Sequence, residues 1–277
     1  MKKQKLATSV IITLILALLA AMFVLPLIWM ILSSLKTTNE VFSRPFHWLP
    51  AVFQWKNYKM VWTDQTVNML RSYWNTFKIT MLGTVCQLLF ASMAGYAFAK
   101  IPFKGKNVVF LLFLSSMMVP SQVTIIPRYM LFKTVGLYNN HWSIILPMWF
   151  GATAIFMLRQ FYIGLPNDLM EAAKIDGAGH FRIFVQIMMP LTKAAMVSLF
   201  ILAFIGSWNE YLSPLIFITD TQKYTISQAI RWYMLDDLQR YELTMAAATS
   251  SIVPVVILFL FCQKYFVEGI ATTGVKG

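Results

Sequence analysis

The chain has 277 residues, of which 58% are hydrophobic and only 12% are charged, against about 25% charged residues in ordinary soluble domains. So large a hydrophobic share exceeds what one soluble core can bury. It indicates a protein whose apolar surface lies in the lipid bilayer. The net charge of +12 does not indicate nucleic-acid binding, because the basic residues are scattered among short loops and form no basic stripe interleaved with aromatic residues.

Six stretches of the chain lack Asp, Glu, Lys and Arg, and they are continuously apolar rather than alternating. Apolar runs of about 20 residues predict membrane-spanning helices rather than the strands of a transmembrane barrel. The fifth stretch, between Lys193 and Glu210, is the shortest. We therefore expect an all-α polytopic membrane protein with six transmembrane helices, at about residues 6–32, 76–99, 107–127, 142–162, 191–212 and 243–263.

The first apolar run follows Lys2, Lys3 and Lys5 and begins like a signal peptide. It is longer than the roughly 7–15 residues of a signal-peptide core, and no clean small-residue cleavage site follows it. We expect a retained signal-anchor helix.

An even number of spans places both termini on one side of the membrane. Short basic clusters favour the cytoplasmic side, and two such clusters are Lys2, Lys3, Lys5 and Lys100, Lys104, Lys106. We therefore expect both termini in the cytoplasm, with long loops at about 33–73 and 213–241 outside. The first loop is rich in aromatic residues (Trp48, Trp55, Tyr58 and Trp62). It is either a folded cap or docking surface for an external partner, or a segment that packs on the helix ends.

One segment between the fourth and fifth spans carries a distinctive pattern, over residues 166–191. Asp168 is expected to cap a short helix, with Glu171 completing a capping-box-like start. Ala172 and Ala173 offer a small-residue face, and Gly177 follows Asp176 as the residue that tolerates a left-handed helix end. A second amphipathic segment has apolar residues at helical spacing and leads into the fifth span at Pro190; these residues are Phe181, Phe184, Met188 and Leu191.

This segment resembles the EAA loop of ABC importer permeases. The residues that match its pattern are Glu171-Ala172-Ala173, Asp176-Gly177-Ala178, Phe184, Ile187 and Pro190-Leu191. The resemblance extends over most of the chain and points to the carbohydrate uptake branch, whose members are related to the smaller membrane subunit of the maltose importer. Further matching segments are Trp48-Leu49-Pro50, Asn57-Tyr58, Trp74-Asn75-Thr76, 94–100, 208–211 and 274–277. The chain departs from this branch at Ala194 and at 271–273.

The resemblance implies a type I ABC importer transmembrane domain, with the permease core at about 70–263 and the EAA loop at about 164–190. It implies that the loop docks as a coupling helix on a cytoplasmic ATPase subunit, through Glu171, Ala172, Ala173, Asp176, Gly177, Ala178, Phe184 and Pro190. The implied partners are a homologous second permease, a pair of ATPase subunits, an extracytoplasmic sugar-binding protein, the lipid bilayer and a sugar, most simply an oligosaccharide. No nucleic acid is expected.

ATP is expected to bind to the partner subunits, because this chain has no G-x-x-x-x-G-K-[S/T] phosphate loop. The chain itself is therefore expected to hold no cofactor and to be no enzyme. The only histidines are His47, His141 and His180, and neither H-E-x-x-H nor G-x-S-x-G occurs. Cys86 and Cys262 are interpreted as small buried apolar residues rather than a disulfide or a metal pair.

Polar residues at the outer ends of the spans are candidates for the translocation pathway: Gln122, Asn209, Glu210 and Tyr211. An acid at membrane depth is expensive and suggests a function, although Glu210 at the headgroup level would be ordinary. Gln87 and the Ser and Thr residues near Gln122 either bind sugar hydroxyls or join helices, as such residues commonly do in membranes.

Two other interpretations remain. A permease of the same architecture can import a non-sugar solute such as a glycerol phosphate ester, a polyamine or an amino acid. An ion-driven secondary transporter is a weaker alternative, because such proteins usually place ionisable residues near the bilayer midplane and these spans are nearly free of charge at their centres.

Overall fold

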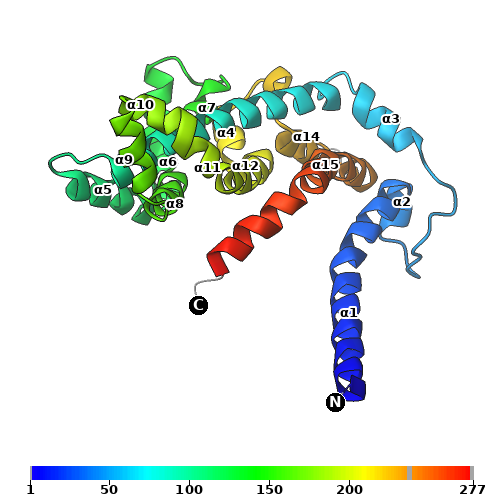
Figure 1. Cartoon of the computed structure of the whole chain (residues 1–277). Coiled ribbons are helices and arrows are strands. Elements are labelled where there is room, and N and C mark those ends of the chain that lie inside the picture. The colour runs from blue at the N-terminus through cyan, green and yellow to red at the C-terminus, as the bar shows by residue number, and fades with distance from the viewer. Residues whose placement is uncertain (1, 236–238, 275–277) are drawn as a thin grey trace. The chain divides into compact units, whose positions relative to one another are not determined.

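The structure is a computed structural model (Figure 1). It describes the backbone of residues 2–235 and 239–274, and the side chains of residues 8–235 and 239–263. Within these ranges every regular element is helical and no strand occurs. The side chains of Lys2, Lys3 and Lys5, of the departure at 271–273 and of the tail 274–277 lie outside the described residues. The chain forms two compact units, Met1–Leu70 with Ala229–Val253, and Arg71–Gln228 with Pro254–Gly277.

The first unit begins with α1 (Lys2–Ser34), whose apolar part Thr8–Ser34 is 27 residues long. Its central side chains are exposed on all faces, which suits a helix surrounded by lipid. The unit continues with α2 (Thr38–Val41) and α3 (Lys56–Thr63), and it includes the first part of α15 (Tyr241–Gly274).

The aromatic loop of the first unit is folded against the end of α1. The Asn57 amide donates to the carbonyl oxygens of Ser34 and Lys36, both at 2.9 Å, and the Tyr58 hydroxyl lies 2.7 Å from Ser34 Oγ. By contrast Trp48 and Trp55 are exposed. The loop therefore packs on the end of α1 through its Asn57-Tyr58 part, and it keeps an exposed aromatic surface elsewhere.

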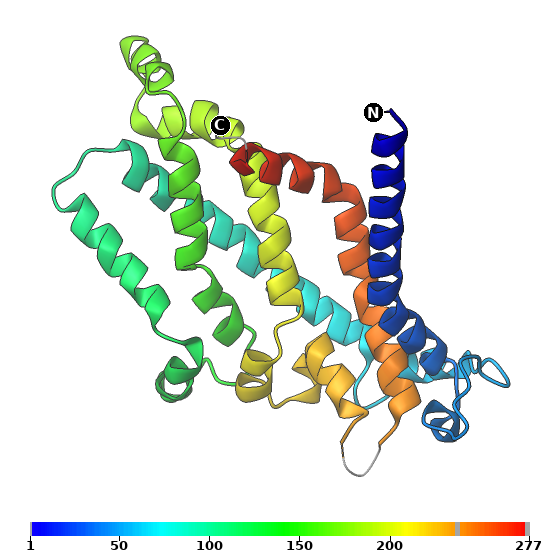
Figure 2. The ribbon, with the colours of Figure 1, turned by 90° about the horizontal axis from the view of Figure 1, so that it is seen from below.

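The second unit holds the remaining helices. They are α4 (Met69–Lys100, from Arg71), α5 (Lys106–Ser115), η1 (Ser116–Met118), α6 (Ser121–Thr134), α7 (Trp142–Met148), α8 (Ala152–Ile163), α9 (Asp168–Ile175), α10 (His180–Ile183), the π-helical η2 (Phe184–Met188), α11 (Met189–Leu191), α12 (Lys193–Trp208), α13 (Leu212–Phe217), η3 (Thr221–Lys223) and the start of α14 (Ile226–Trp232). The yellow α12 lies beside the green α8 (Figure 2).

The core of the second unit lies where α4, α8, η2 and α12 meet, and it includes Leu158, Tyr162, Phe184, Met188 and Leu199. A Cβ on Gly95 would lie 3.0–3.2 Å from atoms of Leu158 and Arg159. Glycine therefore lets α4 approach α8 at this point. One turn earlier on α4, the Ser92 hydroxyl lies 2.7 Å from the Tyr162 hydroxyl.

Four helical segments are long and apolar enough to cross a membrane on their own: Thr8–Ser34, Met69–Lys100, Trp142–Ile163 and Tyr241–Gln263. Two further candidates are bent pairs, Lys106–Met118 with Ser121–Thr134 at 96° and His180–Leu191 with Lys193–Trp208 at 75°. The described residues thus contain four to six spans, in agreement with an all-α polytopic membrane protein.

The expected span at 107–127 is broken into two helical parts. Val119 is extended (φ −84°, ψ 115°) directly before Pro120, because a residue that precedes proline is disfavoured in the helical region. The expected span at 191–212 is shorter as a helix, since α12 runs from Lys193 to Trp208. Its 16 residues rise about 24 Å at about 1.5 Å per residue.

Candidate functional site

The EAA-like segment begins with α9, and its start differs from the expectation. Asn167, not Asp168, is the N-cap residue, and the cap has no side-chain hydrogen bond. Asp168 and Glu171 instead lie in the first turn, with Lys174 in the last, where they complement the positive and negative ends of the helix dipole. The prediction that Asp168 caps the helix was therefore wrong by one residue.

The Asn167 side chain is engaged elsewhere, by the carboxyl end of α4. Lys100 Nζ donates to Asn167 Oδ1 at 2.6 Å and to the Leu165 carbonyl at 2.7 Å. Arg159 Nε also donates to the carbonyl of Phe98, at 3.3 Å, and its guanidinium lies 4.1 Å from the centre of the Phe110 ring. The Lys100 contacts attach the start of α9 to α4, and the Arg159 contacts attach α8 to α4 and α5.

The end of α9 confirms the prediction for Gly177. This residue has φ +80°, the left-handed conformation that glycine adopts without strain. Ala178 N donates to the Ala173 carbonyl at 2.9 Å, and Gly177 N donates to the Lys174 carbonyl at 3.0 Å. This pair of hydrogen bonds is the Schellman motif, and it sets the angle at which the chain leaves α9.

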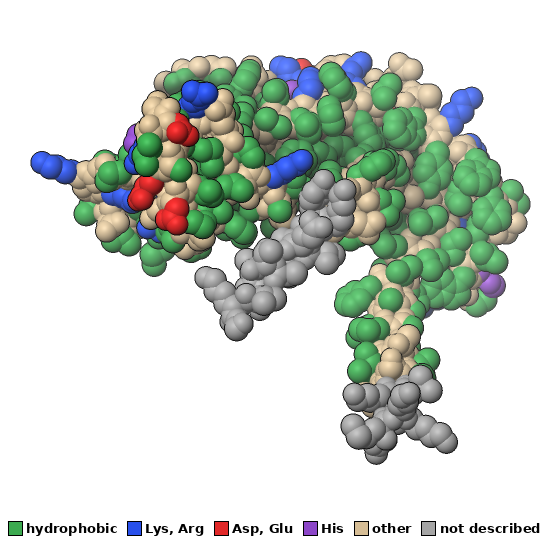
Figure 3. Space-filling model, in the orientation of Figure 1, with side chains coloured by type: hydrophobic (Ala, Val, Ile, Leu, Met, Phe, Trp, Pro, Cys, Tyr) green, Lys and Arg blue, Asp and Glu red, His purple; other side chains and the backbone are tan. Residues whose placement is uncertain are grey.

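The outward surface of α9 is partly apolar. Ala172 and Ile175 are exposed, as is Leu169, and Ile175 is 86% exposed. Met170 is buried and Ala173 packs against the core. Only Ala172 of the expected small-residue pair therefore faces outward. Glu171, Asp176 and Gly177 are also exposed, and Figure 3 shows acidic and basic side chains gathered over this part of the second unit.

The second part of the segment does not form the single helical face that its spacing predicts. Phe184 and Met188 are buried, whereas Phe181 and Leu191 are exposed. The physical reason is the π-helical turn at Phe184–Met188, which adds a residue to the turn and shifts the faces of the helix. Phe184 packs on Tyr96, with ring centres 5.3 Å apart. Ala178 also packs against the core, while Pro190 is exposed.

A second candidate site is a polar pocket of about 360 Å³ in the second unit. Its polar lining comes from α4, α6, α12 and α13 together with the segment between α12 and α13: Gln87, Arg128, Ser207, Glu210 and Ser213. Its apolar lining includes Ile144, Pro147 and Met148 from α7.

Ser213 links the two charged residues of this pocket. Its backbone N–H donates to Glu210 Oε1 at 2.8 Å, and its hydroxyl accepts from Arg128 Nη2 at 3.2 Å. The guanidinium also lies 4.8 Å from the centre of the Phe217 ring. Neither Arg128 nor Glu210 takes part in a salt bridge within the described ranges.

The structure brings only one of the four pathway candidates into this pocket. Glu210 lines it, whereas Gln122, Asn209 and Tyr211 are exposed and do not. Asn209 Nδ2 donates back to the Ile205 carbonyl at 3.0 Å. Sequence reasoning did not single out Arg128, because as a charge it marked the end of an apolar stretch. The sequence feature that could have identified Arg128 is the position of a basic residue directly after an apolar run.

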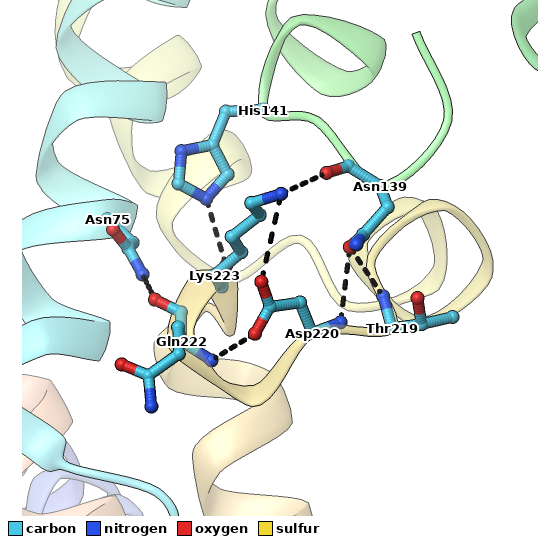
Figure 4. Close-up of polar contacts among 7 residues, drawn as sticks. All are labelled: Asn75, Asn139, His141, Thr219, Asp220, Gln222 and Lys223. Carbon is cyan, nitrogen blue, oxygen red and sulfur yellow. Dashed lines mark hydrogen bonds and ion pairs between the residues drawn. The ribbon is translucent and has the colours of Figure 1, made fainter. Parts of the chain in front are cut away.

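At the other end of α4, polar side chains hold the segment 218–225 (Figure 4). Asn75 Nδ2 donates to the carbonyl oxygens of Gln222 and Tyr224 at 3.0 and 3.1 Å. Asn139 Oδ1 accepts from the backbone N–H groups of Thr219 and Asp220, both at 3.1 Å. The Thr76 hydroxyl also accepts a hydrogen bond from Ile226 N at 2.9 Å. The Trp74-Asn75-Thr76 segment thus has a structural role.

His141 belongs to the same network. Its Nε2 lies 2.9 Å from the Lys223 carbonyl, so this nitrogen carries the proton and donates. Burial lowers the pKa of His141, and the nearby charges of Lys78 and Lys223 lower it further, while the bond to the Lys223 carbonyl opposes them. His141 is therefore a neutral structural group.

No group of three or more His, Cys, Asp or Glu side chains that could hold a metal ion occurs among the described residues. Cys86 and Cys262 are free thiols. Both are half-buried rather than fully buried.

Residues 87–272 match the family described as the inner membrane component of binding-protein-dependent transport systems. The arabinooligosaccharides transport system permease protein AraQ of Bacillus subtilis is 33% identical over 96% of this chain and 95% of its own length. The sn-glycerol-3-phosphate transport system permease protein UgpE of Brucella abortus is 29% identical over 99% of both chains.

A crystal structure of a bacterial ABC transporter involved in the import of the acidic polysaccharide alginate contains a chain of similar fold. The TM-score is 0.81, with 23% identity over 94% of this chain and 96% of that chain. The likeness shows that the two chains share their fold.

Proposed function

Because this chain belongs to the family of inner membrane components of binding-protein-dependent transport systems, we propose that it is the permease subunit of an ATP-driven importer for an oligosaccharide. The observation that carries the proposal is α9. It is a short helix fixed at both ends, by Lys100 at its start and by the Schellman motif at its end, and it presents Ala172 and Ile175 to a partner.

In this proposal α9 is the coupling helix. The exposed surface of Leu169, Ala172 and Ile175 packs into a cleft of an ATPase subunit, and Glu171 meets a basic group there. Buried residues such as Phe184 support the helix from behind rather than touching the partner. ATP binds to the pair of ATPase subunits, and a homologous second permease completes the pathway.

The proposed orientation assigns the end of the second unit that carries α9 to the cytoplasm. This end carries several basic residues, which favour the cytoplasmic side: Lys100, Lys104, Lys106, Lys174 and Arg182. The segment 218–225 then faces outward with the other end of α4, toward an extracytoplasmic binding protein. With an even number of spans, both termini are also proposed to lie in the cytoplasm.

An oligosaccharide is the favoured substrate because AraQ, named for arabinooligosaccharides, is 33% identical over nearly the full length of both chains. The name of UgpE indicates sn-glycerol 3-phosphate as the competing substrate. A phosphate ester carries close to two negative charges at neutral pH. The polar pocket pairs the carboxylate of Glu210 with the guanidinium of Arg128, so it offers no net positive charge to a phosphate ester, which favours a neutral saccharide.

The coupling part of the proposal is tested by ATP-driven transport in the complex purified through this chain and reconstituted into proteoliposomes. Gly177→Ala places a side chain at φ +80°, whereas Gly105→Ala places one at φ +78°, and neither Cβ meets another atom within 4 Å. The two substitutions impose the same backbone strain, about 1–2 kcal/mol, but only Gly177 ends α9. We expect Gly177→Ala to lower ATP-driven transport at least tenfold and Gly105→Ala to leave it within twofold. Equal effects of the two would contradict a specific role for α9.

A further inference from the structure

The polar pocket of the second unit combines a group that only donates hydrogen bonds with a group that only accepts them. We propose that Arg128 and Glu210 bind two neighbouring hydroxyl groups of a neutral sugar ring in this pocket. This chain then supplies a saccharide-contacting site of its own. The inference rests on the proposed function, because it specifies the substrate chemistry of the same importer.

Arg128 has unused hydrogen-bonding capacity that points to a missing partner. Its Nη2 donates to Ser213, but its Nε is shielded from solvent and has no hydrogen-bond partner among the described residues. A guanidinium carries five N–H donors, and a buried donor without a partner destabilises the folded state. Nε is as closed to a ligand as it is to water, so a sugar oxygen in the pocket would accept from the other donors of this half-buried guanidinium.

Only one of the two carboxylate oxygens of Glu210 is hydrogen-bonded. One carboxylate oxygen accepts from Ser213 N at 2.8 Å, while the other has no hydrogen-bond partner within the described part of the chain, and the residue lines the pocket. A carboxylate accepts from hydroxyl groups and donates to none. A hydroxyl that donates to Glu210 can therefore lie beside one that accepts from Arg128, which is the pattern of a vicinal diol.

Gln87 adds a third polar group to the pocket. A Cβ on Gly151 would lie only 2.2 Å from Gln87 Nε2, so the glycine at the start of α8 leaves the room that the Gln87 amide occupies. This amide makes no hydrogen bond with any described residue, and it lines the pocket. An amide both donates and accepts, which suits a further sugar hydroxyl.

The remaining lining and the size of the pocket also suit a sugar ring. Ile144, Pro147 and Met148 provide apolar surface for the C–H groups of a ring. The volume of about 360 Å³ lies at the lower end of the roughly 300–1,000 Å³ found for small-molecule sites. An acidic saccharide fits the charges less well, because Arg128 and Glu210 together leave the pocket without a net positive charge to bind a carboxylate.

The test uses the whole importer in proteoliposomes with its binding protein, and the probes are arabinotriose, maltotriose and trigalacturonate. Glu210→Gln keeps an acceptor for Ser213 N but removes the charge, and Arg128→Gln removes the guanidinium. Lys133→Gln is the matched control, because it removes a basic residue from the same helix α6 at an exposed position outside the pocket.

We expect Glu210→Gln and Arg128→Gln each to lower uptake of the imported neutral trisaccharide about tenfold, the effect of roughly one charged hydrogen bond. ATP hydrolysis stimulated by the loaded binding protein is expected to stay within twofold of the unsubstituted protein, and Lys133→Gln to leave uptake unchanged. A deoxy analogue that lacks the bound hydroxyl should lose less uptake in Glu210→Gln than the parent sugar does.

Three results would overturn the inference. One is uptake that falls no more than in Lys133→Gln. Another is ATP hydrolysis that falls in parallel with uptake, which would assign Arg128 and Glu210 to joining α6 and α13 through Ser213. The last is import of trigalacturonate by the unsubstituted importer that is faster than import of either neutral trisaccharide. If the unsubstituted importer carries no saccharide at all, the proposed function itself fails, and this outcome is distinct from the other three.

Discussion

Lys100, the last residue of α4, donates a 2.6 Å hydrogen bond to Asn167, the residue that precedes α9. The ammonium group also donates to the Leu165 carbonyl at 2.7 Å. One side chain thus fixes the start of the proposed coupling helix to a long helix of the same unit. We therefore expect a movement of α9 to be passed to α4 through this side chain.

The first prediction concerns this link. Lys100→Met keeps the aliphatic part of the side chain but removes both hydrogen bonds, each worth about 1.5–3 kcal/mol when one partner is charged. We expect ATP hydrolysis in the purified complex to persist while substrate uptake per ATP falls at least fivefold. Lys104→Met is the control, because Lys104 is exposed in the loop before α5. An unchanged ratio of uptake to hydrolysis in Lys100→Met would contradict the role of this link.

The second prediction concerns the contact of α4 with α8 at Gly95. Gly95→Ala places a Cβ 3.0 Å from the backbone nitrogen of Arg159, and overpacking of this kind destabilises by about 1–3 kcal/mol. We expect a clear decrease in the thermal unfolding temperature in detergent. Gly179→Ala should leave that temperature unchanged, because nothing lies within 4 Å of its added Cβ. Equal unfolding temperatures for the two variants would refute close packing at Gly95.

The third prediction concerns the hydroxyl pair of Ser92 and Tyr162. Both residues are buried and their oxygens lie 2.7 Å apart. Tyr162→Phe leaves the Ser92 hydroxyl without this partner, which costs about 1–3 kcal/mol. We expect Ser92→Ala combined with Tyr162→Phe to be less destabilising than the sum of the single changes, as measured by chemical unfolding of the four proteins in one detergent. Strict additivity would mean that the two hydroxyls are not coupled.

The fourth prediction concerns pH and His141. Because burial lowers the pKa of His141 in the folded protein, the unfolded chain binds a proton more readily than the folded one. Stability is then greatest above the unfolded pKa of about 6.5 and decreases as the pH falls below it. We expect the unfolding temperature to fall between pH 7 and pH 5. His141→Gln should flatten this dependence, and an equally steep fall in that variant would assign the effect to other groups.

The sequence predicts the features of α9 that depend on neighbouring residues better than those that depend on contacts with distant residues. Gly177 was identified correctly because a left-handed helix end depends on one residue and its neighbours. The start of the helix was misplaced because Asn167 is held by Lys100, which lies 67 residues earlier in the chain. Local patterns carry no information about such a contact.

Two further differences between the sequence-based predictions and the structure have similar causes. The positions of Phe181 and Phe184 could not be assigned from regular spacing, because a π-helical turn interrupts it. Arg128 escaped notice because a charge next to an apolar run indicates the end of a span, whereas here α6 carries it back into a pocket after the bend at Pro120. Exposed Gln122, Asn209 and Tyr211 show that polarity near a helix end does not by itself place a residue in a pocket.

The central claim is tested most directly by uptake of labelled arabinotriose, maltotriose and sn-glycerol 3-phosphate in cells with and without this chain. The account predicts that loss of the chain abolishes uptake of a neutral oligosaccharide, that the unsubstituted chain restores it, and that Gly177→Ala does not. Loss of sn-glycerol 3-phosphate uptake with unchanged sugar uptake would contradict the assigned substrate, and unchanged uptake of all three would contradict the account.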